Sequence, residues 1–563
     1  MNEEKSSIQS FDVSLGAAPV TSRATKQLEP WNVLVCSDLG FISSQSELLR
    51  ISEWNEFMGS KKIVVSGAVE NVLERGGKPF YIEHTVSSMK DFSLENMLEK
   101  IGALSGYARV YSALSQLIKG AGDETGALKV IESSGMPVSE QSRVRSLLRG
   151  PRASASEKPQ DKTPRSGINK ILSMVDFGES QPEEKPADIP QSASDSFIAA
   201  MATGSGPGFQ KGPLEVYVDG LEKKLHDQVM AIQTQPFFAS RKASWQCLMD
   251  CARAIGRKNE IILRVFSAPS GEMEENFARV LENSIETSTL PDILLWDFGV
   301  SFTNADMEQM AKIAEAADQY KCALIAPLSM DDQFFKGLSQ LDNLSPLFEN
   351  VRFLPFKKLR TNPASRCLCL CAPDVQVPGK ERSTDSTITA RSGWALLERW
   401  IESLLNASDP FAVTAPTGQE NELLKDAVFC ENIPPRLSEE ASRAGITLFD
   451  KPPAAMTFDR AVAVIDSESA GSAYSSLAFN VLVNRVARLS VTRLSVSAPQ
   501  KNKDTAAKDL CSFLQNELIP YHVLGSPDQM TAVVGKEGEI ELTINSDVKV
   551  SGFLAQFSFS LNV

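Results

Sequence analysis

The chain has 563 residues, of which 57 are Lys or Arg and 71 are Asp or Glu, for a formal net charge of −14 at pH 7. This length corresponds to roughly three or four domains, and the acidic excess opposes non-specific attraction to nucleic acid or to an anionic membrane. No apolar run approaches the roughly 20 residues of a membrane span, and the polar start lacks the basic head and apolar core of a signal peptide, so we expect a cytoplasmic protein.

Residues 1–149 are expected to form an α/β region. Phe11, Val13 and Leu15 alternate with polar residues, which is typical of a half-buried strand, and this strand has no obvious local partner. Further elements are predicted from apolar periodicity: strands at Trp31–Gly40, Lys62–Val69 and Phe80–Val86, and helices between Leu94 and Lys119.

Residues 150–165 consist mainly of Pro, Ser, Ala, Lys and Arg without apolar periodicity, which predicts a flexible linker. A short amphipathic helix is expected next, with four apolar residues on one face: Ile168, Ile171, Leu172 and Val175. A second segment rich in Pro and Glu, residues 179–194, separates this helix from the rest of the chain. The helix is either a docking segment for a partner or an element that packs on its own domain.

Residues 166–260 are predicted to be mainly helical, and residues 261–563 to form an α/β core. A long helix in the first region has one apolar face, made of Leu221, Leu225, Val229 and Ile232. In the core, Ile293–Trp296 and Ala323–Ala326 are continuous apolar runs, typical of strands buried on both faces. The helix between them is capped by Thr303, with an acidic residue three positions later. Such a strand-helix-strand unit is expected to be parallel and right-handed.

The nine cysteines are scattered, which fits reduced, buried thiols better than a disulfide framework. Cys367, Cys369 and Cys371 alternate and would point to one face of a strand, where core packing explains them more simply than a metal or redox site. The three histidines lie in separate segments, so no histidine-based metal or catalytic site is predicted. We expect no cofactor.

Two alternating strands end the chain, after a helix with a long buried face. Apolar residues of the last strand alternate with polar ones: Phe553, Ala555, Phe557, Phe559, Leu561 and Val563. The preceding strand has the same pattern at Ile540, Leu542 and Ile544. Alternating strands left free at both termini would offer edges to other chains.

Several motifs, in order, are similar to the large contractile sheath subunit of type VI secretion (TssC, or VipB). The run Phe356–Arg360, then Ser365-Arg366, a strand and Pro373, resembles that family's signature, although Phe356 replaces a Trp and Cys367 a Tyr. An earlier helical motif is matched by Gln228, Ile232, Pro236, Phe238, Trp245 and Leu248, but not by Lys242 and Gln246. The segment Phe479–Arg488 resembles a later helical motif, with Arg488 in place of a His.

Residues 1–149 resemble the small subunit of the same sheath (TssB, or VipA). Val33–Leu39 and Lys90–Glu95 occupy the places of its strand motif and of its motif before the helices, with Cys36-Ser37 and Leu94 as departures. The resemblance therefore covers nearly the whole chain, as a small subunit fused to a large one across residues 150–165.

The resemblance implies an α/β sheath-type fold with mixed sheets, flanking helices, a helical outer domain and terminal strands exchanged between protomers. The inter-protomer strands would carry Phe11, Val13, Leu15, Phe553, Phe557, Phe559 and Leu561. Such a protomer polymerises into a helical tube around an inner tube (Hcp-like), together with baseplate and distal-cap proteins, and contracts to eject the inner tube. The helix Ile168–Val175 would correspond to the element that an AAA+ unfoldase (ClpV) binds when it disassembles contracted sheaths.

Two other classes of function stay open. A nucleotide enzyme would be indicated by a P-loop or by G-x-G-x-x-G after a strand, and neither motif is present. Gly204–Gly208 is glycine-rich but follows residues expected to be helical, and Ser87–Lys90 matches S-x-x-K without companion motifs. A scaffold or adaptor that never polymerises would keep the α/β fold but should not leave apolar strands free at both ends.

Overall fold

The computed structural model describes residues 10–13, 28–74, 78–149, 212–256, 260–286, 289–330, 334–335, 338, 344, 348–378, 387–407, 410–411, 427–452, 461–466, 472–497, 502–536 and 538–561. The chain divides into two compact units that do not follow chain order. The larger unit comprises Met1–Ala68, Glu83–Phe92 and Gln233–Val563, and the smaller unit comprises Val69–Ile82 and Ser93–Ile232. The expected boundary at residues 150–165 lies outside the described residues, and the chain on both sides of it belongs to the smaller unit.

The larger unit is built on a seven-stranded sheet with the order β13-β9-β8-β7-β2-β6-β3. Its strands are β2 (Trp31–Ser37), β3 (Glu47–Leu48), β6 (Ile261–Ser267), β7 (Ile293–Trp296), β8 (Ala323–Pro327), β9 (Leu368–Ala372) and β13 (Ile446–Leu448). Neighbouring strands are parallel except for β3, which pairs antiparallel with β6. The predicted buried strands are confirmed, since every residue of β7, β8 and β9 is buried. The fold is mixed α/β, with a mixed sheet and flanking helices.

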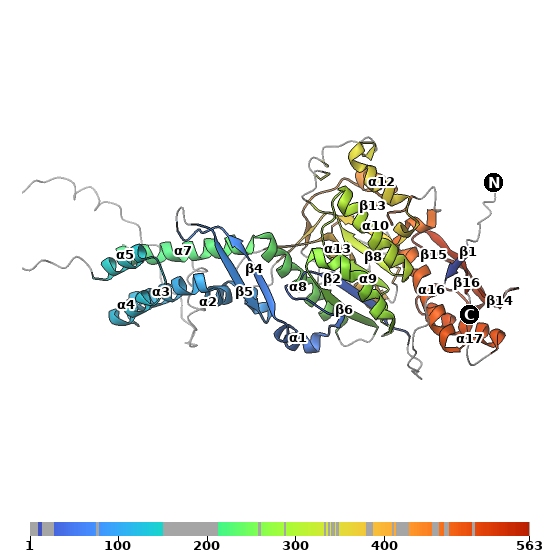
Figure 1. The fold of residues 1–563 in the computed structure, drawn as a ribbon, viewed down its shortest axis with the longest axis horizontal. Helices are drawn as coiled ribbons and strands as arrows, with labels where there is room; N and C mark the ends of the chain where they lie inside the picture. The colour runs from blue at the N-terminus through green and yellow to red at the C-terminus, as the bar shows by residue number, and fades with distance from the viewer. Residues whose placement is uncertain are drawn as a thin grey trace, which may run out of the picture. The chain divides into compact units, whose positions relative to one another are not determined.

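One face of this sheet is covered by α9 (Ser270–Glu286), α10 (Asn304–Gln319) and α12 (Leu354–Arg360), which Figure 1 labels, and by α14 (Pro435–Arg443). The predicted cap of α10 is confirmed, because the side chain of Thr303 accepts a hydrogen bond from the backbone N–H of Asp306 at 3.2 Å. In return, the carboxylate of Asp306 accepts from the N–H of Ser301 at 2.8 Å. Met307 and Met310 lie on the buried face of α10 and belong to the same hydrophobic core as the strands of the sheet.

The opposite face carries α8 (Pro236–Ile255) and α13 (Ser392–Ala407), which contact each other. Helix α13 approaches closely because Gly393 lacks a side chain: a Cβ there would lie 2.6 Å from Leu295. Helix α8 also contacts β11 (Thr387–Ala390). This strand belongs to a three-stranded sheet with β10 (Val375–Pro378) and β12 (Val428–Phe429), in the order β11-β10-β12. Helix α8 is therefore buried on all sides over much of its length, Lys242 included.

The strands from the two ends of the chain form a separate four-stranded sheet with the order β1-β16-β15-β14. They are β1 (Ser10–Val13), β14 (Met530–Val534), β15 (Ile540–Val550) and β16 (Phe553–Leu561), and they lie beside α16 (Leu477–Ser497) and α17 (Lys503–Leu518). Figure 1 shows the blue strand β1 among the red strands of the C-terminal region. Strands β15 and β16 are joined by Ser551 and Gly552, both with positive φ (49° and 85°), as a tight hairpin turn requires.

The smaller unit is mainly helical, with α2 (Leu94–Lys100), α3 (Gly102–Ile118), α4 (Glu124–Glu132), α5 (Val138–Arg149) and most of α7 (Pro213–Gln233). Three tyrosine hydroxyls donate hydrogen bonds to glutamates within it: Tyr107 to Glu74 (3.2 Å), Tyr111 to Glu222 (2.9 Å) and Tyr217 to Glu140 (3.3 Å). Burial, and then the neighbouring carboxylates, raises the pKa of each of these tyrosines, so they stay neutral donors.

The remaining elements are short. They are α1 (Trp54–Ser60), the two-stranded sheet of β4 (Ile63–Val69) and β5 (Phe80–Val86), and 3-10 turns at Ile51–Glu53, Met89–Phe92, Val351–Phe353, Pro363–Cys367, Ser472–Ser475 and Pro527–Gln529. Among the helices in the described ranges, none has both the length and the hydropathy needed to cross a bilayer.

Two details differ from the expectations. The strand predicted to begin at Cys367 begins at Leu368, because Cys367 closes the 3-10 turn before it. The N-terminal strand, for which no local partner was evident, pairs within the same chain with β16, more than 500 residues away. The two terminal strands are therefore partners of each other in this structure, with β16 inside the sheet and β1 at its edge.

Candidate assembly interface

The terminal sheet has one apolar face and one polar face. On β16, Ala555, Phe557, Phe559 and Leu561 are buried, and β15 places Ile544, Leu542 and Ile540 opposite the last three of them. The apolar face packs on the helices beside it, where the Phe557 and Phe479 rings meet edge to face with centroids 6.0 Å apart. Residues between them on the strands are exposed or half-buried, among them Glu541 and Ser558. The predicted alternation is confirmed for β16.

Strand β1 adds to this sheet in parallel, with Phe11 opposite Phe559 and Val13 opposite Leu561. It forms one edge of the sheet, and β14 forms the other. Leu15, the third residue predicted for this strand, lies outside the described residues. Six of the seven residues predicted for exchange between protomers therefore lie in this one sheet: Phe11 and Val13 on β1, and Phe553, Phe557, Phe559 and Leu561 on β16.

Phe553 differs from the other aromatic residues of β16, because it is only half-buried. It lines a cavity of about 500 Å³ where the β15–β16 turn meets β13 and α14. Thr447 of β13, Arg443 of α14 and Ser551 of the turn line the same cavity. The first residue of β16 therefore faces the central sheet rather than the helices α16 and α17.

A buried group of charges ties the helices of the terminal sheet to the central sheet. Arg485 of α16 donates to both carboxylate oxygens of Asp292, at 3.1 and 3.2 Å, and to the carbonyl oxygen of Glu29 at 2.6 Å. Its guanidinium also stacks on Trp31, the first residue of β2, 3.8 Å from the ring centroid. Arg488, one turn further on α16, pairs with Asp292 as well. These contacts join α16 to the amino ends of β2 and β7.

Glu517 of α17 completes the group. Its two carboxylate oxygens accept from the backbone N–H of Glu29, each at 3.1 Å, and one of them lies 3.7 Å from Arg485. Burial raises the pKa of Glu517 from 4.5 to about 7, and the charge of Arg485 opposes that rise. The segment that leads from β1 into the central sheet is therefore held by side chains of both helices under the terminal sheet.

Sequence reasoning located Arg488 within a motif but did not identify this group of charges. A usable signal was present: Arg485 and Arg488 are three residues apart on a helix that is otherwise apolar at Val481, Leu482 and Val486. Two arginines on the buried side of a helix require carboxylate partners, because an unpaired buried charge is costly. The identity of those partners, Asp292 and Glu517, is visible only in the folded chain.

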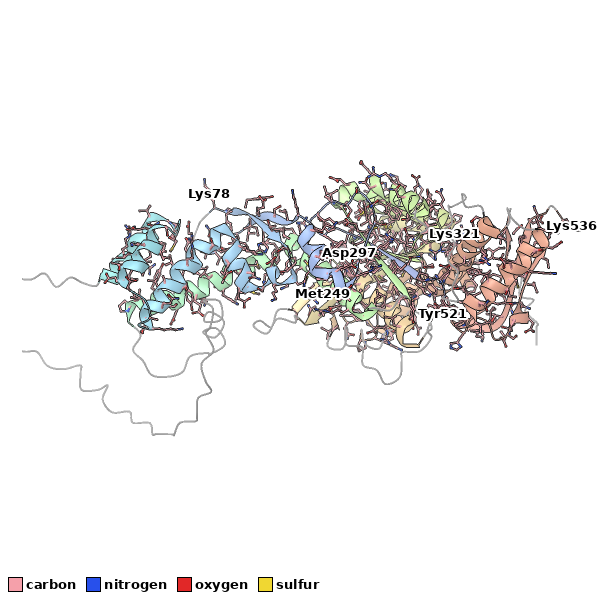
Figure 2. The ribbon with its side chains drawn as sticks, turned by 90° about the horizontal axis from the view of Figure 1, so that it is seen from below. Lys78, Met249, Asp297, Lys321, Tyr521 and Lys536 are labelled. Carbon is pink, nitrogen blue, oxygen red and sulfur yellow. The ribbon has the colours of Figure 1, made fainter. Side chains whose placement is uncertain are left out.

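The carboxyl edge of the central sheet is the place where many parallel α/β folds bind ligands. Here Asp297, at the end of β7, is only 1% exposed and lies inside the larger unit (Figure 2). Its carboxylate accepts from the hydroxyls of Ser37 (2.7 Å) and Ser244, and Arg391 donates to its carbonyl oxygen at 2.7 Å. These bonds link β7 to β2, to α8 and to the start of α13, so the polar groups at this edge hold the layers together.

The three alternating cysteines are all buried: Cys369 and Cys371 lie on β9, and Cys367 ends the 3-10 turn before it. The thiol of Cys371 donates to the carbonyl of Ala326, and that of Cys369 lies 3.4 Å from the hydroxyl of Thr447. The thiol of Cys367 contacts the carboxylate of Asp318, and burial raises the pKa of this thiol to about 12. Within the described residues, no group of three or more His, Cys, Asp or Glu side chains is arranged to hold a metal ion.

The predicted docking helix, with Ile168, Ile171, Leu172 and Val175, lies outside the described residues, as does the glycine-rich segment Gly204–Gly208. Comparison of the chain with models of known protein families gave no match, and a search of curated proteins gave no significant match.

Proposed function

We propose that this chain is a cytoplasmic structural protomer of a contractile sheath, of the kind found in type VI secretion. It would polymerise into a helical tube around an inner tube and eject that tube on contraction. The observation that carries the proposal is the terminal sheet, in which a strand from one end of the chain pairs with a hairpin from the other end. The ordered motifs that resemble the small and large sheath subunits supply the identity of the assembly.

The physical basis is strand exchange. Strand β1 is short and lies at the sheet edge, so an identical strand from a neighbouring copy can occupy the same place with the same contacts. Fourteen residues, 14–27, separate β1 from Leu28, and a chain of that length spans at most about 50 Å. A neighbouring protomer whose sheet edge lies within that distance could receive the strand. The exchange would keep protomers connected while the lattice rearranges.

The partners follow from the same proposal. An Hcp-like inner tube would fill the sheath, and baseplate and distal-cap proteins would close its ends. A ClpV-type AAA+ unfoldase would recycle the contracted form by binding the helix predicted at Ile168–Val175.

Deletion of residues 1–16 tests the proposal. The wild-type chain, alone or with its inner-tube partner, is expected to form hollow tubes in negative-stain electron microscopy. The deletion should abolish the tubes but leave the thermal transition almost unchanged, because four residues at a sheet edge add little to the stability of their own protomer. Each lost backbone hydrogen bond is worth about 0.5–1.5 kcal/mol, a loss that is repeated at every contact of the lattice.

Substitution of Asp12 by Asn, which keeps the length and apolar pattern of β1, serves as the matched control and should still allow tubes. Tubes of normal order from the deletion variant would refute strand exchange. A wild-type chain that stays monomeric in sedimentation velocity, with and without the partner, would favour a non-polymerising scaffold.

A further inference from the structure

The helices on one face of the central sheet form a layer with opposite charge at its two sides. Helix α10 contacts α9 on one side and α12 on the other, and Figure 1 shows the three in that order. The two flanks of this layer, which we call the α9 flank and the α12 flank, differ in both charge and hydropathy.

The α9 flank is acidic. Helix α9 carries one basic residue, Arg279, against four described acidic side chains: Glu272, Glu274, Glu275 and Glu282. Some of these charges are used within the layer, since Lys312 pairs with Glu274 at 2.9 Å. Glu275, Ala278 and Glu282 are exposed at spacings of three and four residues, so they share one stripe of α9. Ala278, whose side chain is small, lies between the two glutamates along this stripe.

The α12 flank is basic and apolar. The stretch Val351–Arg360 has four basic residues and no acidic one. Val351 is 82% exposed and Leu354 is 62% exposed, although both lie next to the fully buried rings of the same segment. Lys358 follows on the same helix face and is also exposed, and so is Arg352. Lys357 and Arg360 pair with Glu349 and Asp466 within the same chain. Two neighbouring large aliphatic side chains, exposed to this degree and flanked by Arg352 and Lys358, form a distinct contact surface.

We propose that the α12 flank of one copy docks on the α9 flank of the next copy. Val351 and Leu354 would pack over Ala278, while Arg352 and Lys358 would face Glu275 and Glu282. Because the two flanks are different surfaces of the same chain, the contact is heterologous and repeats from copy to copy instead of closing as a symmetric dimer. The contact rests on the proposed function in one respect, since a tube requires a repeating contact of this kind.

The overall charge of the chain supports self-docking. With a formal net charge of −14, copies repel one another unless opposite charges meet locally. The α12 flank is a basic region on this acidic protein, and the acidic flank that complements it belongs to the same helical layer. A nucleic acid would bind Arg352 and Lys358 through phosphates but would leave Val351 and Leu354 without an apolar partner. The exposed aliphatic pair therefore favours a protein surface.

A charge-exchange experiment tests this contact with the full-length chain. Variant one carries Arg352→Glu and Lys358→Glu, and variant two carries Glu275→Lys and Glu282→Lys. Each variant alone brings like charges together at the contact, so the concentration needed for assembly should rise by roughly tenfold or more. An equimolar mixture should regain assembly, because each flank of one variant then meets an oppositely charged flank of the other. A substitution of exposed Lys62 and Lys119 by Glu matches the charge change of variant one and should have little effect.

The outcomes separate this inference from the proposed function. If the wild type forms tubes and both variants do so equally well, the contact is wrong while the sheath proposal stands. If the wild type forms no tubes, the sheath proposal fails, and the contact is then decided by sedimentation velocity at low ionic strength: a mixture of the two variants that does not associate refutes it. Assembly of the wild type that disappears on nuclease treatment would assign the α12 flank to nucleic acid and also refute it.

Discussion

Arg485 connects three parts of the larger unit through one side chain. It pairs with Asp292 before β7, stacks on Trp31 at the start of β2 and lies near Glu517 of α17. Its side chain is 1% exposed, and that of Asp292 is fully buried. A planar guanidinium can make two-pronged bonds to a carboxylate while its face rests on an indole, which a lysine cannot do. Arginine at this position is thus explained by geometry as well as by charge.

We expect Arg485→Leu to destabilise the larger unit by about 3–5 kcal/mol, because it leaves the buried carboxylates of Asp292 and Glu517 short of a partner. Arg485→Lys should recover only part of the loss. Chemical denaturation followed by tryptophan fluorescence measures this unit specifically, since all six tryptophans lie within it.

Arg493→Ala is the matched control. Arg493 pairs with Asp509 between the same two helices at 2.8 Å, but the pair is partly exposed, so its loss should cost about 1 kcal/mol or less. Equal losses of unfolding free energy for Arg485→Leu and Arg493→Ala would show that the buried group of charges stabilises the unit no more than a partly exposed ion pair does.

At the scale of single elements, close packing decides which glycines are required. In the smaller unit, α3 passes against the backbone that follows α4, and a Cβ on Gly106 would lie 1.8 Å from the carbonyl oxygen of Ser134. Gly220, in α7, has no atom within 4 Å of a Cβ placed on it. Glycine is a poor helix former in both places, yet only Gly106 is needed for packing.

Gly106→Ala should therefore destabilise the smaller unit by about 1–3 kcal/mol or more, because the backbone must move to admit a methyl group. Gly220→Ala should stabilise it by about 0.5–1 kcal/mol through improved helix propensity. Hydrogen exchange of the α3 and α7 amides reads out both effects. A neutral or stabilising Gly106→Ala substitution would contradict the close approach of α3 to Ser134.

At the scale of the whole molecule, the N-terminal region is not an independent domain. Strand β2 lies inside the central sheet, paired with β6 over Trp31–Ser37 and with β7 over Val33–Cys36. Both partner strands come from the chain beyond residue 260. The larger unit therefore has no complete central sheet unless the regions before and after residues 150–165 fold together.

A protease site inserted between residues 150 and 165 tests this interdependence. After cleavage, the two fragments should still co-elute in size-exclusion chromatography and should separate only in denaturant, because β2 is hydrogen-bonded on both sides and almost wholly buried. Fragments that separate in native buffer would contradict the central position of β2. The uncleaved protein with the same insertion shows whether the insertion itself disturbs the fold.

The local elements could be read from the sequence, because apolar periodicity and capping act over a few residues. The alternation in β16, the buried runs in β7 and β8, and the cap formed by Thr303 all depend on near neighbours along the chain, and each is found in the structure. The inward-facing side chains of β16 were predictable for the same reason, because alternation alone indicates which residues of a strand face the core.

The pairing of distant segments required the tertiary structure. Nothing local to β1 indicates that it lies parallel to β16, and nothing local to Arg485 identifies Asp292, 193 residues away. The same holds for the division into units, for β2 as an inner strand, and for the opposite charges of the α9 and α12 flanks. These features depend on which surfaces meet when the whole chain packs, and many partners of similar apolar pattern satisfy the local rules equally well. The choice among them is made by burial and charge pairing over the complete fold.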